Sequence, residues 1–175
     1  MDPLMEYNIP IQGLNSGLHR FEFRIGAQFF NHFENSLVDQ GNFEVTVEMD
    51  KRPDMLECLF TIEGNIPTNC DRCLAPISMP INGEQTLLFK FTEDALEEED
   101  EIVFIPYGTS ILDLSQYIYE AISLSIPLVK MYDCENEEVV PCNKEMLEIL
   151  RGKENDKSTD ESNPIWDALK GFNDN

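Results

Sequence analysis

The sequence predicts an α+β protein: a single domain in which an antiparallel sheet packs against a few helices, followed by a tethered C-terminal helical segment. Three observations predict this class. Several short stretches alternate apolar and polar residues, which is typical of half-buried strands. Residues 113–125 instead repeat their apolar residues at helical spacing. The chain has 175 residues, enough for one domain with a real core.

The first regular elements follow an irregular N-terminal stretch. Phe21, Phe23 and Ile25 alternate with charged residues, so we expect a half-buried strand there. The next apolar residues recur at helical spacing and predict a helix over about residues 27–40: Phe29, Phe30, Phe33 and Leu37.

A hairpin is predicted from two alternating runs, residues 43–50 and 55–63, joined by a turn that contains Pro53. Leu56, Cys58, Phe60 and Ile62 share one face of the second run. We interpret Cys58 as a core residue, because a free cysteine behaves as a small hydrophobic side chain.

The second half of the chain predicts more strands and one strong helix. Pro76 and Pro80 confine their stretch to a sheet edge or an irregular extension, and a short strand is expected at residues 102–105. The helix over 113–125 should begin with Asp113 and Gln116 as a capping box, and Pro127 should end it.

We expect the main domain to cover residues 1–150, a polar linker to cover 151–163, and a helical peptide to cover 164–175. The peptide contains the only tryptophan, Trp166, and is either a docked tail or a partner-binding motif. Residues 93–101 hold seven acids and no base, so they predict a solvated loop.

Charge limits the choice of partner. Thirty-four acidic against twelve basic residues give a net charge of −22, which disfavours direct binding to naked nucleic acid and favours basic proteins or metal ions. The N-terminus lacks the pattern of a signal peptide, and no segment has the ~20 apolar residues of a membrane span. We therefore expect a cytoplasmic protein whose five cysteines are metal ligands or buried thiols.

Cys70 and Cys73 are separated by two residues, and three interpretations of this pair remain open. They could be a metal corner completed by Cys134 and Cys142, with structural zinc as the candidate cofactor. They could be a redox pair, although Asp71 and the nearby prolines disfavour a reactive thiol. They could also belong to a plain structural turn.

We predict no catalytic residues. The sequence has no nucleophile elbow, no phosphate-binding loop, no dinucleotide fingerprint and no paired histidine motif. The alternative is a small metal- or thiol-dependent enzyme that uses Cys70 and Cys73.

Four motifs stand out in combination: Cys70-x-Arg72-Cys73-Leu74, the helix start at Ile111-Leu112-Asp113-Leu114, the Leu-x-x-Pro at 124–127 with a cysteine-bearing acidic loop after it, and Asn163-Pro164 leading to Leu169-Lys170. Together these motifs resemble the YceD family of large ribosomal RNA subunit accumulation proteins.

The resemblance implies a non-catalytic factor that supports accumulation of large-subunit rRNA, through maturation or assembly of that subunit. Its expected partner is a basic ribosomal protein or a particle that is a precursor of the large subunit, met by the acidic surface. The candidate partner-binding residues are Arg72, Pro164, Trp166, Leu169 and Lys170.

Overall fold

The computed structural model describes residues 4–93, 102–132 and 141–155. These residues form two compact units. The larger unit runs to Asn69 and resumes over Pro76–Lys130, whereas the smaller one combines Cys70–Ala75 with the described residues from Met131 onward. The predicted acidic loop beyond Glu93 and the C-terminal peptide over 164–175 lie outside the described residues.

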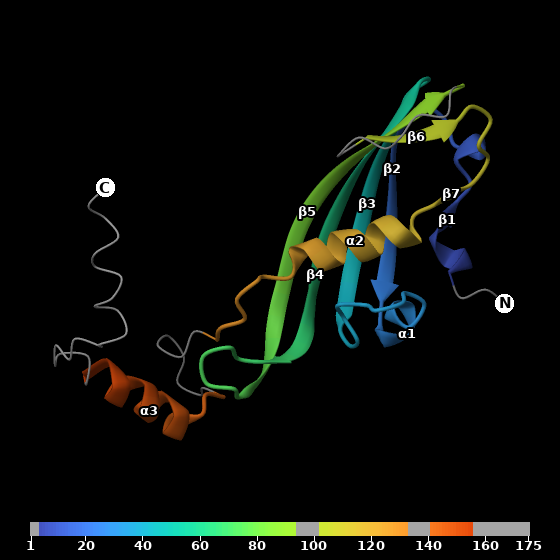
Figure 1. Ribbon diagram of the computed structural model, residues 1–175. Coiled ribbons are helices and arrows are strands. Elements are labelled where there is room, and N and C mark those ends of the chain that lie inside the picture. The colour runs from blue at the N-terminus through green and yellow to red at the C-terminus, as the bar shows by residue number, and fades with distance from the viewer. Residues whose placement is uncertain (1–3, 94–101, 133–140, 156–175) are drawn as a thin grey trace, which may run out of the picture. The chain divides into compact units, whose positions relative to one another are not determined.

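The larger unit is built on a five-stranded sheet in the order β2-β3-β4-β5-β6 (Figure 1). The strands are β2 (Gly17–Ile25), β3 (Asn42–Lys51), β4 (Met55–Asn69), β5 (Pro76–Thr92) and β6 (Ile102–Pro106). The first three pairings are antiparallel, but β5 and β6 run parallel. The predicted α+β class is confirmed, with one parallel edge strand added.

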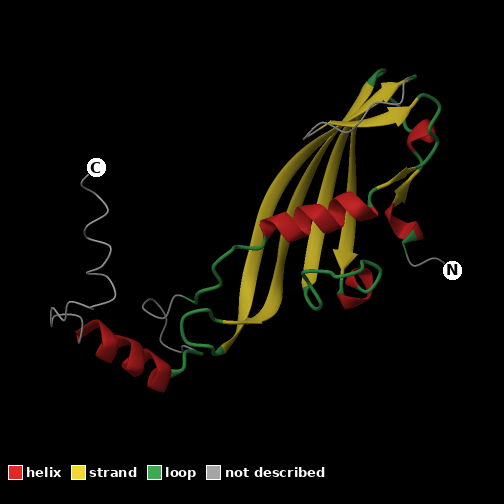
Figure 2. Cartoon of the chain, viewed as in Figure 1, coloured by secondary structure: helices red, strands yellow, loops and turns green. Residues whose placement is uncertain are grey.

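Short elements and helices complete the described structure. The N-terminal region contains η1 (Met5–Tyr7), β1 (Asn8–Ile9) and η2 (Ile11–Gly13), and β1 pairs antiparallel with β7 (Leu112–Asp113). The α-helices are α1 (Ala27–Phe30), α2 (Ser115–Ser125) and α3 (Lys144–Asn155). Helix α2 crosses one face of the sheet over β4 and β5 (Figure 2). We call this face the inner face and the opposite one the outer face.

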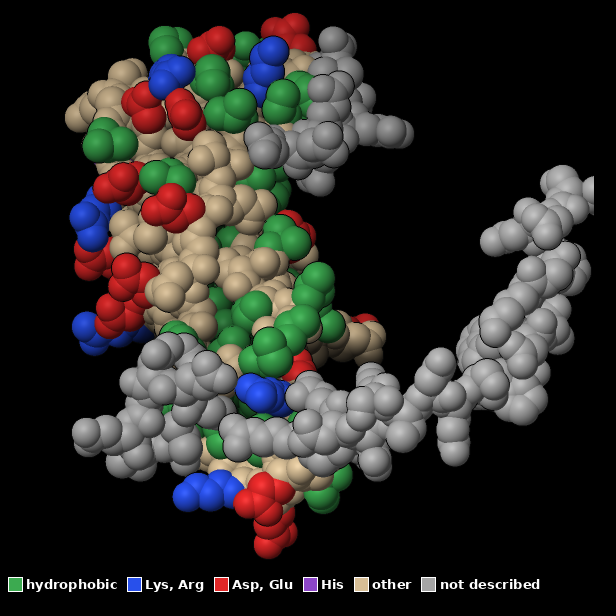
Figure 3. Space-filling view, turned by 90° about the vertical axis from the view of Figure 1, so that its left-hand side faces the viewer, with side chains coloured by type: hydrophobic (Ala, Val, Ile, Leu, Met, Phe, Trp, Pro, Cys, Tyr) green, Lys and Arg blue, Asp and Glu red, His purple; other side chains and the backbone are tan. Residues whose placement is uncertain are grey.

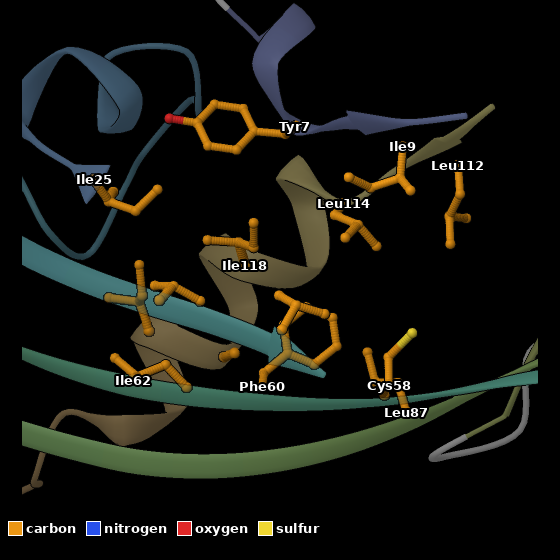
Figure 4. Packing of buried hydrophobic residues seen from close by; sticks show 14 of the residues in the cluster. Tyr7, Ile9, Ile25, Cys58, Phe60, Ile62, Leu87, Leu112, Leu114 and Ile118 are labelled. Atoms are coloured by element: carbon orange, nitrogen blue, oxygen red, sulfur yellow. The ribbon is translucent and has the colours of Figure 1, made fainter. Parts of the chain in front are cut away.

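The core lies between the inner face and α2. Alternate residues of β4 point inward, and the predicted set of Leu56, Cys58, Phe60 and Ile62 is confirmed, with each side chain at most 1% exposed. Ile118 of α2 packs among them, with Tyr7, Ile9 and Leu112 from the N-terminal region and β7 (Figure 4). Burial raises the pKa of the Cys58 thiol to about 12, and the charge of Glu57 adds to this effect.

The predicted helix over 27–40 is wrong beyond its first turn, because α1 ends at Phe30. After Phe30 the amides of His32 and Phe33 bond carbonyls three residues back, so the chain continues in tight turns. Asn35 then takes a left-handed conformation with φ of 56°, which prevents the helix from resuming. The Ser36 hydroxyl then bonds the backbone of Val38, so local side-chain bonding replaces helical bonding. Leu37 is 80% exposed rather than part of a buried stripe.

The predicted second helix is confirmed, but the predicted cap is wrong, because Leu114 rather than Asp113 is the N-cap residue and makes no side-chain capping bond. The Asp113 carboxylate accepts a 2.9 Å hydrogen bond from the Ser115 amide and so satisfies a free N–H at the start of α2. Gln116 does not reach back to complete the capping box, because its amide donates to Glu120 instead. Helix α2 ends at Ser125, shortly before Pro127.

Strands β4 and β5 form a hairpin that extends beyond β3. Strand β3 pairs with β4 only as far as Asn65, whereas β4 and β5 stay paired to Asn69 and Pro76. Strand β6 pairs only with residues 88–92 of β5, so Pro76 and Pro80 lie on an open sheet edge, as predicted. The turn Cys70–Ala75 joins the two strands.

Candidate functional site

The two-cysteine turn is tightly closed by its own backbone. The Cys70 amide donates a 2.8 Å hydrogen bond to the Ala75 carbonyl, and the Leu74 amide donates one of 2.8 Å to the Cys70 carbonyl. Leu74 adopts a left-handed conformation with φ of 58°, which is costly for a leucine. Its side chain is 63% exposed, so core packing does not explain its presence there.

Both sulfurs of the turn are enclosed, with Cys70 and Cys73 each 0% exposed. Burial alone would raise the pKa of the Cys70 thiol. The amides of Tyr132, Cys73 and Arg72 donate hydrogen bonds to the sulfur, the Cys73 thiol adds another, and together they bring the pKa below its ordinary value. A buried sulfur surrounded by amide donors is the environment that favours a thiolate bound to a metal.

The rest of the predicted metal shell is not assembled in the described residues. No group of three or more His, Cys, Asp or Glu side chains there is placed to hold a metal ion. Cys142 is buried and forms a disulfide, so it would have to be reduced before it could bind a metal as a thiolate. Cys134 lies outside the described residues. The zinc site therefore stays a prediction.

Of the predicted partner-binding residues, only Arg72 lies within the described part of the chain. Its side chain is exposed between the two cysteines. Pro164, Trp166, Leu169 and Lys170 lie outside it. In the smaller unit, α3 begins where Asn143 accepts a hydrogen bond from the Met146 amide.

The outer face of the sheet is a second candidate surface, which the sequence analysis did not single out. It contains a hollow of about 360 Å³ lined by charged side chains, among them Arg20, Glu22, Arg24, Glu44 and Glu48. Charged side chains of both signs also gather along one side of the space-filling view in Figure 3. The alternation of glutamates in the sequence predicts a solvent face, but only the strand register shows which of them are neighbours.

Acidic side chains outnumber basic side chains on the outer face of the sheet. Arg20 pairs with Glu22 at 3.1 Å and Arg24 with Glu44 at 3.8 Å, and both pairs are well exposed. Arg52 bridges Asp50 and Glu57. No Lys or Arg of the described residues lies within ion-pair distance of three further carboxylates, those of Glu48, Glu63 and Glu84. These carboxylates stay available to an external cation.

Fold and site together define a small acidic α+β protein whose long hairpin ends in a buried two-cysteine turn. A family model described as "Large ribosomal RNA subunit accumulation protein YceD" matches residues 59–173, more than half of the chain. The chain belongs to the YceD family, as its motifs indicate. No curated protein and no solved structure matches the chain. None of the described helices is long and apolar enough to cross a membrane.

Proposed function

We propose that this protein is a non-catalytic cytoplasmic factor that supports biogenesis of the large ribosomal subunit by binding a basic ribosomal protein or a precursor particle. The family match over residues 59–173 is the observation that carries the proposal. The family description names accumulation of an rRNA and names no reaction.

Charge supports a protein partner over naked rRNA. Phosphate contacts depend on Lys and Arg, and this chain has a net charge of −22. The same field attracts basic proteins and accelerates their encounter. The unpaired carboxylates Glu48, Glu63 and Glu84 offer contacts for Lys and Arg side chains of such a partner. Arg72 and the tail residues Pro164, Trp166, Leu169 and Lys170 are proposed as further contacts.

A pull-down from lysate at rising salt tests the proposal. We expect the full chain to recover a basic large-subunit protein or a precursor particle at low salt and to lose it as salt screens the contact. The variant Glu48→Gln/Glu63→Gln/Glu84→Gln should bind less well. A matched control, Glu34→Gln/Glu145→Gln/Glu148→Gln, removes the same charge elsewhere and should bind nearly as wild type. Failure to recover any ribosomal component at low salt would sink the proposal.

We also propose that Cys70, Cys73, Cys134 and Cys142 bind one structural zinc ion when all four are reduced. The amide donors around the Cys70 sulfur support this proposal, because they stabilise the thiolate that zinc requires. Elemental analysis of reduced protein should find zinc near one ion per chain. Cys70→Ser should lose the zinc and stability together, whereas Cys58→Ser should keep the zinc. Zinc-free reduced protein would leave a plain structural turn.

A thiol-dependent enzyme is the second candidate function, and it is favoured by the amide hydrogen bonds to the Cys70 sulfur, which lower the pKa of its thiol. The complete burial of both sulfurs opposes it, because a nucleophilic thiolate must meet its substrate. A thiol-exchange assay separates the two functions. Exchange activity that disappears in Cys70→Ser while partner binding persists would favour the enzyme.

A further inference from the structure

Strand β2 is an edge strand of the sheet, and no described strand pairs with its backbone on the side away from β3. It pairs with β3 at every residue from Gly17 to Ile25 and ends the strand order. No backbone hydrogen bond joins these nine residues to any other described segment. A row of backbone donors and acceptors is therefore open to another strand.

This edge carries little of the usual protection against pairing. Native edge strands are blunted by prolines, charged side chains (lysines above all), bulges or short length. The charged residues of β2 are Arg20, Glu22 and Arg24, which alternate in sign and can therefore pair with a second copy of the strand. Strand β2 contains no proline and no lysine, and its residue-for-residue register with β3 leaves no room for a bulge. The opposite side of the sheet is protected, because Pro76 and Pro80 occupy the open part of β5 and β6 has only five residues.

The side chains of β2 are complementary to a second copy of the same strand. Phe21 is the middle residue, and a two-fold axis through it is the one antiparallel arrangement that pairs all nine residues. In this register Arg20 lies opposite the partner's Glu22, and by symmetry the contact forms twice. A two-fold axis through a neighbouring residue would instead place Arg20 opposite the partner's Arg20, or Glu22 opposite the partner's Glu22.

Apolar burial on the inner face points to the same register. Phe21 and Phe23 are only half-buried within one chain although they face the core side. Pairing about Phe21 places it against the partner's Phe21, and Phe23 against the partner's His19. Cross-strand aromatic pairs of this kind each contribute about 0.2–1 kcal/mol.

We propose that two copies of this chain associate through β2, antiparallel about Phe21, so that their sheets become one continuous sheet. Two chains of net charge −22 repel at long range. Because salt screens that repulsion but leaves backbone hydrogen bonds intact, the dimer should be favoured at moderate rather than low salt. The proposal stands independently of ribosomal binding.

Sedimentation velocity over a range of concentrations, with reducing agent and moderate salt, tests the proposal. The wild-type chain should show a monomer–dimer equilibrium. Arg20→Glu and Glu22→Arg should each weaken dimerisation about tenfold, because each introduces two like-charge contacts. The double variant R20E/E22R restores both contacts and should recover the dimer. The side chains of Arg20 and Glu22 are 59% and 71% exposed, so we expect circular dichroism to show that every variant is folded.

Three outcomes would overturn the proposal. The first is a wild-type chain that stays monomeric at every concentration. The second is a dimer that neither single exchange weakens, since its interface would then lie elsewhere. The third is a dimer that the single exchanges weaken and the double exchange does not restore, since Arg20 would then not face the partner's Glu22.

Discussion

Gly83 of β5 lies directly against Ser125, the last residue of α2. A Cβ atom built on Gly83 would collide with the Ser125 hydroxyl oxygen and Cβ. The missing side chain therefore lets the end of the helix approach the sheet. Ile118 and Ile122 of the same helix are fully buried in the core.

Gly83→Ala should lower the free energy of unfolding by about 1–3 kcal/mol, the usual cost of overpacking a well-packed contact. Gly13→Ala is the control, because a Cβ there meets nothing within 4 Å. Urea denaturation of both variants measures the difference. An unchanged midpoint for Gly83→Ala would contradict the close contact between Gly83 and Ser125.

Asp113→Ala should lower the free energy of unfolding by about 1 kcal/mol, the usual net contribution of one hydrogen bond. The variant leaves the Ser115 amide without its 2.9 Å acceptor. Gln116→Ala should change stability much less, because its partner Glu120 lies on the exposed surface. Thermal unfolding compares the two variants, and equal effects would contradict the bond between the Asp113 carboxylate and the Ser115 amide.

Tyr119 ties α2 to the loop that follows α1. Its ring stacks on Phe33 with centroids 4.2 Å apart, and its hydroxyl oxygen accepts a hydrogen bond from the Leu37 amide. A bond with the Ser36 side chain is the main cause that lowers the pKa of Tyr119. Tyr119→Phe keeps the stack and loses these bonds, so amides near Leu37 should exchange hydrogen faster.

Because its pKa is lowered in the folded chain, Tyr119 contributes to stability in a way that depends on pH. A depressed folded-state pKa favours the ionised form in the folded chain. The stabilisation from this shift is therefore present at high pH and disappears as pH falls through the folded-state pKa. The difference in unfolding free energy between wild type and Tyr119→Phe should grow in alkaline solution. A constant or shrinking difference would contradict the hydrogen bonds assigned to the hydroxyl.

Cys58 should make the protein sensitive to alkali. Burial raises its pKa from 9.0 to about 12, so the neutral thiol is favoured in the folded state. The stability that goes with it is fully present below pH 9.0 and declines as pH rises towards about 12. Cys58→Val removes the ionisable group and should flatten this part of the pH profile. Parallel profiles for the two proteins would place Cys58 outside the core.

Much of the larger unit could be predicted, because its strands and α2 carry their pattern locally. The alternation from Leu56 to Ile62 and the spacing from Leu114 to Ile122 each report one buried face. The helix over 27–40 failed because Asn35 and Ser36 interrupt an apolar spacing that otherwise continues. The parallel direction of β6 depends on the path of the chain between β5 and β6, and the pattern of residues within a strand does not predict that path.

The candidate site could be predicted only in part, for a similar reason. The spacing of Cys70 and Cys73 identified the turn, but the Tyr132 amide at the Cys70 sulfur comes from a distant part of the chain. The proposed pairing of Arg20 with Glu22 of a second copy depends on the strand order and register, which only the structure gives. The predicted roles of Trp166 and Lys170 stay predictions.

The most direct test of the central proposal is the ratio of large-subunit to small-subunit rRNA in cells from which the gene has been deleted. We expect the ratio to fall and the wild-type gene to restore it, because the factor would support accumulation of large-subunit rRNA. Glu48→Gln/Glu63→Gln/Glu84→Gln should restore it less well than the matched Glu34→Gln/Glu145→Gln/Glu148→Gln control. A ratio that stays unchanged on deletion would contradict the proposed function.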